Sequence, residues 1–209
     1  MVALLDLLEE SHGIGKVVDS GFSKMVPVLG RTAAGMVGLW SETALEEPAG
    51  IVTELADIVE KYTGSQIHSL GVCDASVEQS GANLVDLSGG SQARLVRVDD
   101  GRGCQISEFL DCYQIKSAYP DAFGLWIDGD SMAPRINDGQ IVILSPSFPA
   151  VNGQIAVVKV KDQIGVTCKI YRLNQDKVHL IPINERYETK ILDCDRILWA
   201  LGVICKINM

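Results

Sequence analysis

One serine of this chain has the residue type and the setting of a nucleophile. Ser131 follows an apolar stretch, Phe123–Ile127, that predicts a buried strand, and Gly129 ends that strand in a turn. A serine on a turn just past a rigid strand is suited to nucleophilic attack, because the scaffold fixes the direction of its oxygen. In many Gly-Asp-Ser turns, however, the Asp and Ser side chains only hydrogen-bond their own backbone. The turn therefore needs a second observation before it predicts chemistry.

Lys169 is that second observation. It lies in a strand-like stretch, Gly165–Leu173, with apolar neighbours. A serine nucleophile needs a base, and none of the three histidines lies in a related context. A lysine serves as base when burial lowers its pKa, because an apolar environment disfavours the ammonium form. Taken by itself Lys169 indicates a surface lysine on a strand edge, whereas together with Ser131 it predicts a serine–lysine dyad.

Further blocks occur in a fixed order between residues 122 and 207. They are the Gly-Asp-Ser131-Met-Ala-Pro turn, Asp138–Leu144, Pro149–Val158, Cys168-Lys169, Val178–Asn184 and the closing strand Leu198–Ile207. In this order they resemble the catalytic domain of the LexA/phage-repressor family of self-cleaving serine peptidases, the S24 type, which includes UmuD-like proteins. The resemblance implies that Ser131 is the nucleophile and Lys169 the base. It also implies a mainly β fold, a twisted half-open β-barrel of the LexA C-terminal type, here with a few added helices in the N-terminal half.

The turn around the serine has its own expected roles. Backbone N–H groups near Asp130 and Ser131 are expected to stabilise the oxyanion. Asp130 shapes the turn, and Met132 and Pro134 pack and fix it. No metal or other cofactor is expected, because the six cysteines form no Cys-x-x-Cys pair and have no histidine at metal-ligand spacing. Such cysteine usage predicts reduced thiols and a cytoplasmic protein.

The resemblance also implies that the substrate is the chain itself. Members of the family cut an Ala-Gly or Cys-Gly bond upstream of the serine, and Val26–Gly35 closely resembles the LexA cleavage region. The expected cleavage bond is therefore Ala34–Gly35. Small side chains at the bond let the backbone approach Ser131, and Gly35 tolerates a kinked conformation.

Apolar residues upstream of this bond are expected to dock in the active-site cleft as an extended arm. They are Val26, Val28 and Leu29. Since period-two alternation sends both neighbours of Lys169 to the opposite face of its strand, the docked arm is one candidate for burying the amine. Ala49–Gly50 is the alternative cleavage bond, but acidic residues and a proline precede it instead of an apolar run.

We divide the chain into four segments. They are an N-terminal helix and linker (1–25), the cleavage-site arm (26–40), an acidic insertion that packs on the core (41–105) and the peptidase core (106–209). The stretch from 40 to 105 contains eleven Asp and Glu against four Lys and Arg. It separates Gly35 from Ser131 by more residues than in LexA-like chains. Self-cleavage remains feasible, because tripling a loop costs only about 1 kcal/mol.

Local patterns within the insertion predict three elements. Apolar positions three and four residues apart predict an amphipathic helix over Gly50–Tyr62. Ala93–Val98 is expected to form a strand, and Gln105–Cys112 a short helix. The insertion is either a decoration on one side of the core or an interaction surface for a sensor or partner.

Charge and hydropathy limit the partners. The net charge of −9 and the lack of a basic cluster argue against direct DNA contact by this chain. Met1–Leu8 is too short and too soon followed by acidic residues for a membrane span, which disfavours the membrane-tethered signal peptidases that share a Ser-Met-x-Pro turn. The resemblance implies a homodimer through the last strand and a recombinase filament as activator. Ile197–Ile204 is apolar on both faces, which fits a dimer strand or a central strand of a monomer.

Three functions remain open at this point. The first is the self-cleaving regulatory domain of a LexA-like or prophage-type repressor in a stress or DNA-damage response. The second is a stand-alone UmuD-like accessory protein, since only 34 residues precede Gly35, fewer than a helix-turn-helix domain needs. The third is a dimerisation module of the same fold that does not cleave.

Overall fold

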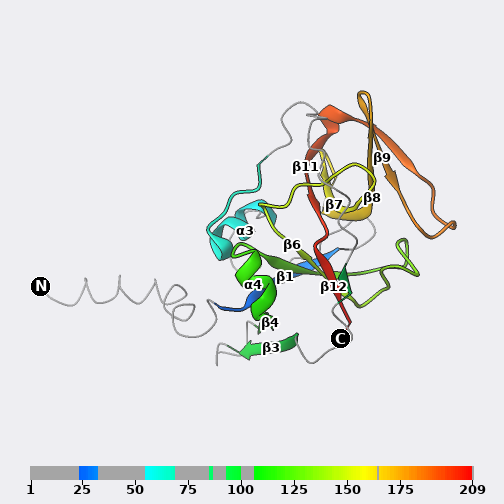
Figure 1. Ribbon diagram of the computed structural model, residues 1–209. Coiled ribbons are helices and arrows are strands. Elements are labelled where there is room, and N and C mark those ends of the chain that lie inside the picture. Colours follow the sequence, from blue (N-terminus) through cyan, green and yellow to red (C-terminus); the bar gives the residue numbers. More distant parts are fainter. Residues whose placement is uncertain are drawn as a thin grey trace, which may run out of the picture.

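Two β-sheets and two α-helices make up the part of the chain that the computed structural model describes, which is residues 24–32, 55–68, 85–86, 93–99, 106–163 and 165–208 (Figure 1). Sheet A contains, in spatial order, β2 (Val85–Asp86), β12 (Cys205–Ile207), β6 (Ile141–Leu144), β5 (Phe123–Ile127), β1 (Val26–Thr32), β4 (Ile106–Asp111) and β3 (Arg94–Asp99). Sheet B contains β10 (Lys190–Asp193), β9 (Lys177–Ile181), β8 (Val166–Asn174), β7 (Ile155–Val160) and β11 (Ile197–Gly202). The helices are α3 (Leu55–Thr63) and α4 (Tyr113–Ala118), and a 3-10 turn, η5, spans Cys194–Arg196.

Sheet A curls into a half-barrel. Most of its strand pairs are antiparallel, but β1 runs parallel to β5, and β2 runs parallel to β12. The predicted fold class, mainly β with a half-open barrel, is confirmed. The sheet takes strands from the predicted arm, from the predicted insertion and from the predicted core. These three stretches of sequence therefore share one structural unit.

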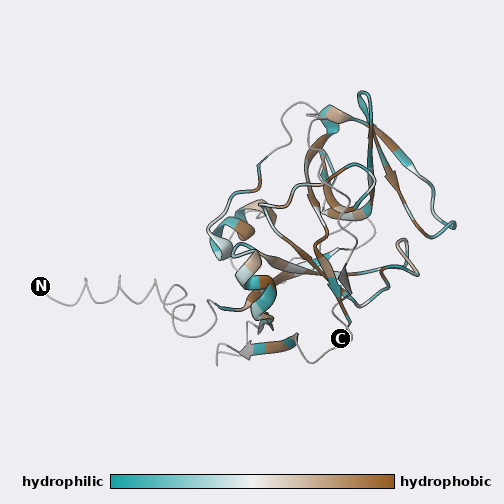
Figure 2. Ribbon diagram, viewed as in Figure 1, coloured by the Kyte–Doolittle hydropathy of each residue, from teal (hydrophilic) through white to brown (hydrophobic). Residues whose placement is uncertain are grey.

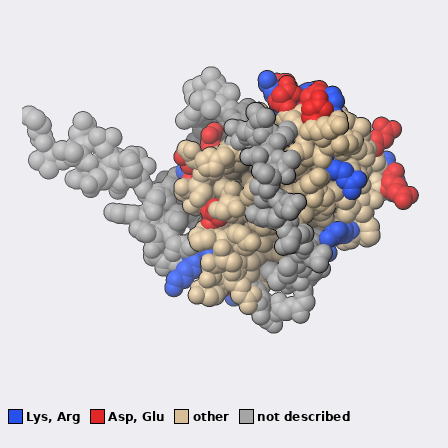
Figure 3. Space-filling view, turned by 45° about the horizontal axis from the view of Figure 1, so that its top comes forward, with Lys and Arg blue, Asp and Glu red and all other residues tan. Residues whose placement is uncertain are grey.

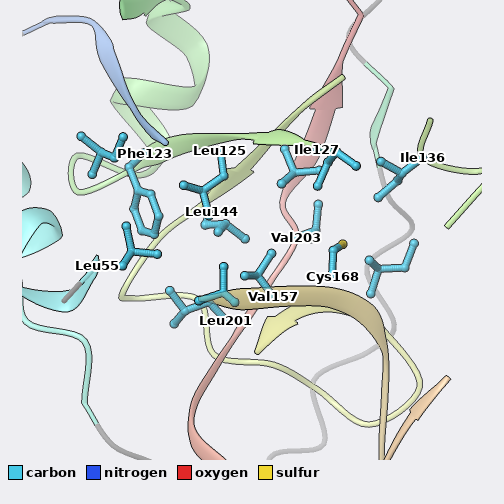
Figure 4. Packing of buried hydrophobic residues seen from close by; sticks show 14 of the residues in the cluster. Leu55, Phe123, Leu125, Ile127, Ile136, Leu144, Val157, Cys168, Leu201 and Val203 are labelled. Atoms are coloured by element: carbon cyan, nitrogen blue, oxygen red, sulfur yellow. The ribbon is translucent and has the colours of Figure 1, made fainter. Parts of the chain in front are cut away.

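The principal hydrophobic core lies between the two sheets. Figure 4 shows side chains of β5 and β6, among them Phe123, Leu125 and Leu144, opposite side chains of β7 and β11, among them Val157 and Leu201. All five are buried. Burial of one such side chain is worth roughly 1.5–3 kcal/mol, so this interface contributes most of the stabilisation that holds the two sheets together. Figure 2 shows the same distribution, with hydrophobic residues on the central strands and hydrophilic residues on the outer loops.

Helix α3 packs against this core from the predicted insertion. Leu55 and Val59 are fully or almost fully buried, and Ile58 and Tyr62 pack beside them. These positions recur at the three-and-four spacing of one helix face, so the predicted amphipathic helix is confirmed over Leu55–Thr63. The predicted start of the helix, before Leu55, lies outside the described residues.

The prediction of a helix over Gln105–Cys112 is wrong. Ile106–Asp111 is strand β4, which pairs with β3 on one side and with β1 on the other. Leu110 and Phe109 are buried on its two faces. Strand pairing on both sides satisfies backbone groups of β4, and this tertiary pairing outweighs the helix propensity of its Glu and Leu residues. The neighbouring helix is instead α4, which follows β4.

Strand β11 is the last strand of sheet B among the described residues and pairs with β7. Its other side is bridged by residues 148–150: the N–H of Ala150 donates to the Ala200 carbonyl oxygen at 3.1 Å, and the N–H of Gly202 donates to the Phe148 carbonyl oxygen at 2.9 Å. Leu198 on this strand is 38% exposed, whereas Ile197 and Trp199 are buried. The backbone groups of Ala200 and Gly202 on the side away from β7 are thus already paired within the chain.

Charged side chains are dispersed over the visible surface. On the face in Figure 3, Lys and Arg side chains of the described residues lie scattered, several of them beside Asp or Glu. Within the described ranges, no helix combines the length and the apolar character needed to cross a membrane.

Candidate active site

The turn that carries Ser131 extends from the end of β5. Gly129 has φ +97°, a backbone conformation that side-chain-bearing residues rarely adopt, and its N–H donates to Asp138 Oδ1 at 2.7 Å. Beyond the serine, Met132 and Ile136 are almost completely buried in the core between the sheets. The turn is therefore held at both ends, and the Ser131 side chain lies half-buried between them.

Lys169 lies on β8, in the other sheet. Its Nζ lies 2.7 Å from Ser131 Oγ, 2.9 Å from the carbonyl oxygen of Cys168 and 3.3 Å from Thr167 Oγ1. The structure thus brings together the two residues that the sequence paired, although 38 positions separate them. Each residue comes from a different sheet, so the 2.7 Å distance depends on how the two sheets pack.

The surroundings of Lys169 disfavour its charged form. Burial lowers the pKa of the amine, and the positive charge of Lys190 lowers it further. A negatively charged Cys168 would act in the opposite direction, but burial raises the pKa of that thiol to about 12. The thiol is therefore protonated near neutral pH and offers the amine no negative charge. The buried thiol is also a poor nucleophile, because the thiolate is the reactive form.

The apolar residues of the predicted arm are not free to dock over Lys169. Val26, Val28 and Leu29 belong to β1, an interior strand of sheet A between β5 and β4. Val26 and Leu29 are buried in the cores on the two faces of that sheet. The expectation of a separate cleft-docking arm is corrected accordingly, and the packing of the two sheets, which also brings β1 close to β8, accounts for the burial of the amine.

The predicted cleavage bonds, Ala34–Gly35 and Ala49–Gly50, lie outside the described residues. The end of β1 does bear on the first of them. Thr32 pairs with Ile127, and its carbonyl oxygen accepts a 2.7 Å hydrogen bond from the N–H of Asp128. Because parallel strands end at the same edge of a sheet, the chain leaves β1 toward Ala34 at the edge where it leaves β5 toward Ser131.

Comparison with known proteins agrees with this geometry. The model of the Peptidase S24-like family matches residues 96–205, which is more than half of the chain. The chain belongs to this family. The match begins within β3 and ends within β12, and it includes both Ser131 and Lys169.

Curated relatives of this chain in the S24-like family are LexA repressors. The LexA repressor of Granulibacter bethesdensis is 43% identical over 76 residues, which are 36% of this chain and 31% of that protein. That of Paramagnetospirillum magneticum is 41% identical over 76 residues, 36% and 32% of the two chains. That of Thermosipho africanus is 32% identical over 103 residues, 46% and 51% of the two chains. The matched stretch thus spans about one third to one half of the length of these relatives.

The sequence analysis missed Thr167 and Tyr187, and from Asn184 it expected only hydrogen bonds to backbone groups at a strand end. Thr167 precedes Lys169 by two positions on β8, so period-two alternation places both on one face of the strand and was sufficient to find it. Asn184 and Tyr187 contact Asp130, as described below. No sequence spacing signals these contacts, because both residues lie in an irregular segment more than fifty positions from Asp130.

Among the described residues, no group of three or more His, Cys, Asp or Glu side chains has a metal-binding arrangement.

A cavity of about 400 Å³ lies apart from the dyad. Its lining comes from the start of β1, from α3, from β4 and from α4 with the turn after it: Lys24, Met25, Pro27, Tyr62, Thr63, Phe109, Tyr113, Lys116, Ser117 and Pro120.

Proposed function

We propose that this chain is the self-cleaving regulatory domain of a LexA-like or prophage-type transcriptional repressor, with Ser131 as nucleophile and Lys169 as base. The observation that carries the proposal is the 2.7 Å contact between Lys169 Nζ and Ser131 Oγ at a buried amine of lowered pKa. A neutral amine is the form that accepts the serine proton, so the contact and the burial both serve the same step.

The hydrogen-bond partners of Lys169 fit the neutral amine. A neutral amine has two N–H donors and one lone pair, and three partners surround this nitrogen. The Cys168 carbonyl oxygen only accepts, and Thr167 Oγ1 accepts the second N–H. In the neutral form, the lone pair faces the Ser131 hydroxyl at the same 2.7 Å, and the hydroxyl then becomes the donor. In this arrangement, both N–H groups and the lone pair of the neutral amine have a partner, as general-base catalysis requires.

The reaction proceeds in two stages. Lys169 takes the proton from Ser131 as the serine oxygen attacks the carbonyl carbon of Ala34, and backbone N–H groups of the turn stabilise the oxyanion. The C–N bond to Gly35 then breaks, and the lysine gives its proton to the departing nitrogen. Water, activated by the neutral lysine, hydrolyses the resulting ester and releases the carboxylate of Ala34 with the free Ser131 hydroxyl.

The choice of the Ala34–Gly35 bond rests on chain direction. This bond begins two residues after Thr32, whose carbonyl oxygen is bonded to Asp128, three residues before Ser131. The last described residue of β1 therefore lies beside the strand end from which the nucleophile turn extends. Ala49–Gly50 remains the alternative.

The repressor context rests on the relatives. These relatives are LexA repressors, which supports a role in transcription regulation. A stress or DNA-damage response is part of the same proposal. The proposal includes a homodimer, for which the exposed apolar side chain of Leu198 on β11 offers a contact. Activation by a recombinase filament belongs to the same proposal, with the chain itself as substrate.

Incubation at alkaline pH tests the proposal directly. Raising the pH deprotonates Lys169 and should drive self-cleavage without an activator, which intact-mass spectrometry detects as two fragments that meet at Ala34–Gly35. Ser131→Ala and Lys169→Ala should remain intact. Lys169→Arg is the matched control, because arginine keeps the positive charge and the N–H donors but does not deprotonate in proteins.

Other outcomes separate the alternatives. Fragments that meet at Ala49–Gly50 would support the Ser131–Lys169 dyad and show that Ala49–Gly50, not Ala34–Gly35, is the cleavage bond. A wild-type chain that stays intact at every pH would contradict self-cleavage and favour a dimerisation module of the same fold.

A further inference from the structure

An irregular segment after β9 lies against the nucleophile turn. The backbone N–H groups of Ile183 and Asn184 both donate to the carbonyl oxygen of Ser131, each at 3.0 Å. Two donors on one carbonyl fix the orientation of the peptide plane that follows the serine. The segment continues directly from sheet B, whereas the turn extends from sheet A, so these bonds join the two sheets beside the dyad.

The side chain of Asn184 adds further bonds to the same turn. Its Nδ2 donates to the backbone oxygen of Asp130 at 3.0 Å and to the Oδ2 atom of that residue at 3.1 Å. Its Oδ1 accepts from the N–H of Arg186 at 3.1 Å. Asparagine suits this position because its side-chain amide supplies both donors and an acceptor. Aspartate lacks the N–H groups, and the amide of glutamine lies one carbon further from the backbone.

Tyr187 completes the contact from the other end of the segment. Its hydroxyl donates to Asp130 Oδ1, and its N–H donates to the Asn184 carbonyl oxygen at 3.1 Å. The hydroxyl bond lowers the pKa of Asp130 and raises the pKa of Tyr187. Each shift favours the protonation state that this bond needs, an ionised carboxylate and a protonated phenol.

We propose that Asn184 and Tyr187 are positioning residues that hold the Ser131 turn in register with Lys169. The nucleophile and the base come from different sheets, and β8, which carries the base, pairs directly with β9, which leads into the segment. The segment thus fixes the position of the nucleophile relative to the base. The inference rests on the proposed dyad chemistry, and it assigns both residues an effect on geometry and none on proton transfer.

Loss of this alignment should reduce the rate strongly. A displacement of about 1 Å between reacting groups costs on the order of a hundredfold in rate. We expect Tyr187→Phe, which removes one oxygen from a 39% exposed side chain, to lower the rate about tenfold or more with an unchanged melting temperature. Asn184→Ala removes two bonds to the turn and should lower the rate further.

The experiment uses the full chain and two readouts. The first is the rate of self-cleavage on the alkaline plateau. The second is the rate at which a fluorophosphonate modifies Ser131, measured by mass spectrometry. In that reaction the serine oxygen displaces fluoride from phosphorus and its proton passes to Lys169, so the readout needs the dyad but not the cleavage bond. Ser131→Ala is the blank, and Tyr113→Phe is the matched control, because Tyr113 is an exposed tyrosine on α4.

A double variant distinguishes positioning from a general structural role. If the Tyr187 hydroxyl acts through Asp130, then Tyr187→Phe combined with Asp130→Ala should be no slower than the slower single variant. Independent structural losses would instead multiply. In every variant, the pH at half-maximal rate should stay that of the wild type, because the base itself is unchanged.

The outcomes separate this inference from the proposed function. Equal labelling and cleavage rates for wild type, Tyr187→Phe and Asn184→Ala would overturn the positioning role. A wild type that is labelled at Ser131 but never cut would overturn self-cleavage. The labelling rates of the two variants would then still decide whether Asn184 and Tyr187 position the serine.

Discussion

The guanidinium of Arg31 lies 3.2 Å from the carboxylate of Asp128, across the ends of two parallel strands. Arg31 is directly opposite Trp126 in the register of β1 and β5, and its Cζ lies 5.3 Å from the centroid of that ring. The charged pair is 37% exposed on both sides. It ties the residue three positions before Ala34 to the residue three positions before Ser131. The pair therefore links the proposed substrate segment to the nucleophile turn.

Breaking this pair should slow self-cleavage more than it destabilises the fold. We expect Arg31→Ala and Asp128→Ala each to reduce the rate about threefold to tenfold, while exposed ion pairs contribute only about 0–1 kcal/mol to stability. Charge reversal in the double variant Arg31→Asp/Asp128→Arg should recover part of the rate. Lys177→Ala, which breaks the exposed Lys177–Asp193 pair on sheet B, is the control. Equal rates in all variants would contradict the link.

The hydroxyl of Thr167 should assist the base. Thr167→Val keeps the shape of the side chain but removes an acceptor of the Lys169 amine. Since that acceptor stabilises the ammonium form, its loss should lower the pKa of Lys169 further and shift the pH–rate profile toward lower pH. The plateau rate should fall about tenfold, because the amine loses one of its orienting contacts. Thr167→Ser keeps a hydroxyl and should keep the wild-type profile, and an unshifted profile for Thr167→Val would refute this role.

Lys169 should reduce stability at neutral pH. Its pKa is lower in the folded chain than in the unfolded chain, so the unfolded state binds more protons between the two pKa values. Stability attributable to this group therefore rises with pH through that interval, and it is lowest below the folded pKa. We expect Lys169→Met to be more stable than the wild type at pH 7, with an advantage that shrinks toward pH 10. Urea unfolding at the two pH values measures this, and a constant difference would contradict it.

Helix α3 should be part of the cooperative unit. Leu55→Ala removes a side chain that is 4% exposed in the core between the sheets, and we expect it to cost about 2–5 kcal/mol of unfolding free energy. Asp57→Ala, on the exposed face of the same helix, should change stability by less than about 0.5 kcal/mol. Chemical denaturation compares the two. Equal, small effects would mean that the helix is an independent decoration.

The residues with local signals were the ones that sequence analysis placed correctly. Ser131 follows an unbroken buried strand and a glycine, and Lys169 interrupts an apolar strand, so each is marked by its immediate neighbours. The spacing of Leu55, Val59 and Tyr62 likewise marks one helix face. In all these cases the deciding pattern extends over about ten residues, which is the range in which periodicity carries information.

The features that sequence analysis misjudged depend on distant partners. Ile106–Asp111 became a strand because two other strands flank it, and β1 became an interior strand because β4 covers its second edge. The bond between Tyr187 and Asp130 joins an irregular segment to a turn. Local propensity depends only on neighbouring residues, so it cannot predict contacts with partners that are distant in the sequence.

The interior position of β1 changes what a cut after it would accomplish. Hydrolysis of Ala34–Gly35 would break one covalent link and leave β1 hydrogen-bonded on both edges, to β4 and to β5. The upstream piece would then be a noncovalent subunit of a nicked protein. Its dissociation would require sheet A to open and the buried side chains of Val26 and Leu29 to enter water. Chain scission and fragment release would thus be two separate events, and the second would set how long the cut protein keeps its original form.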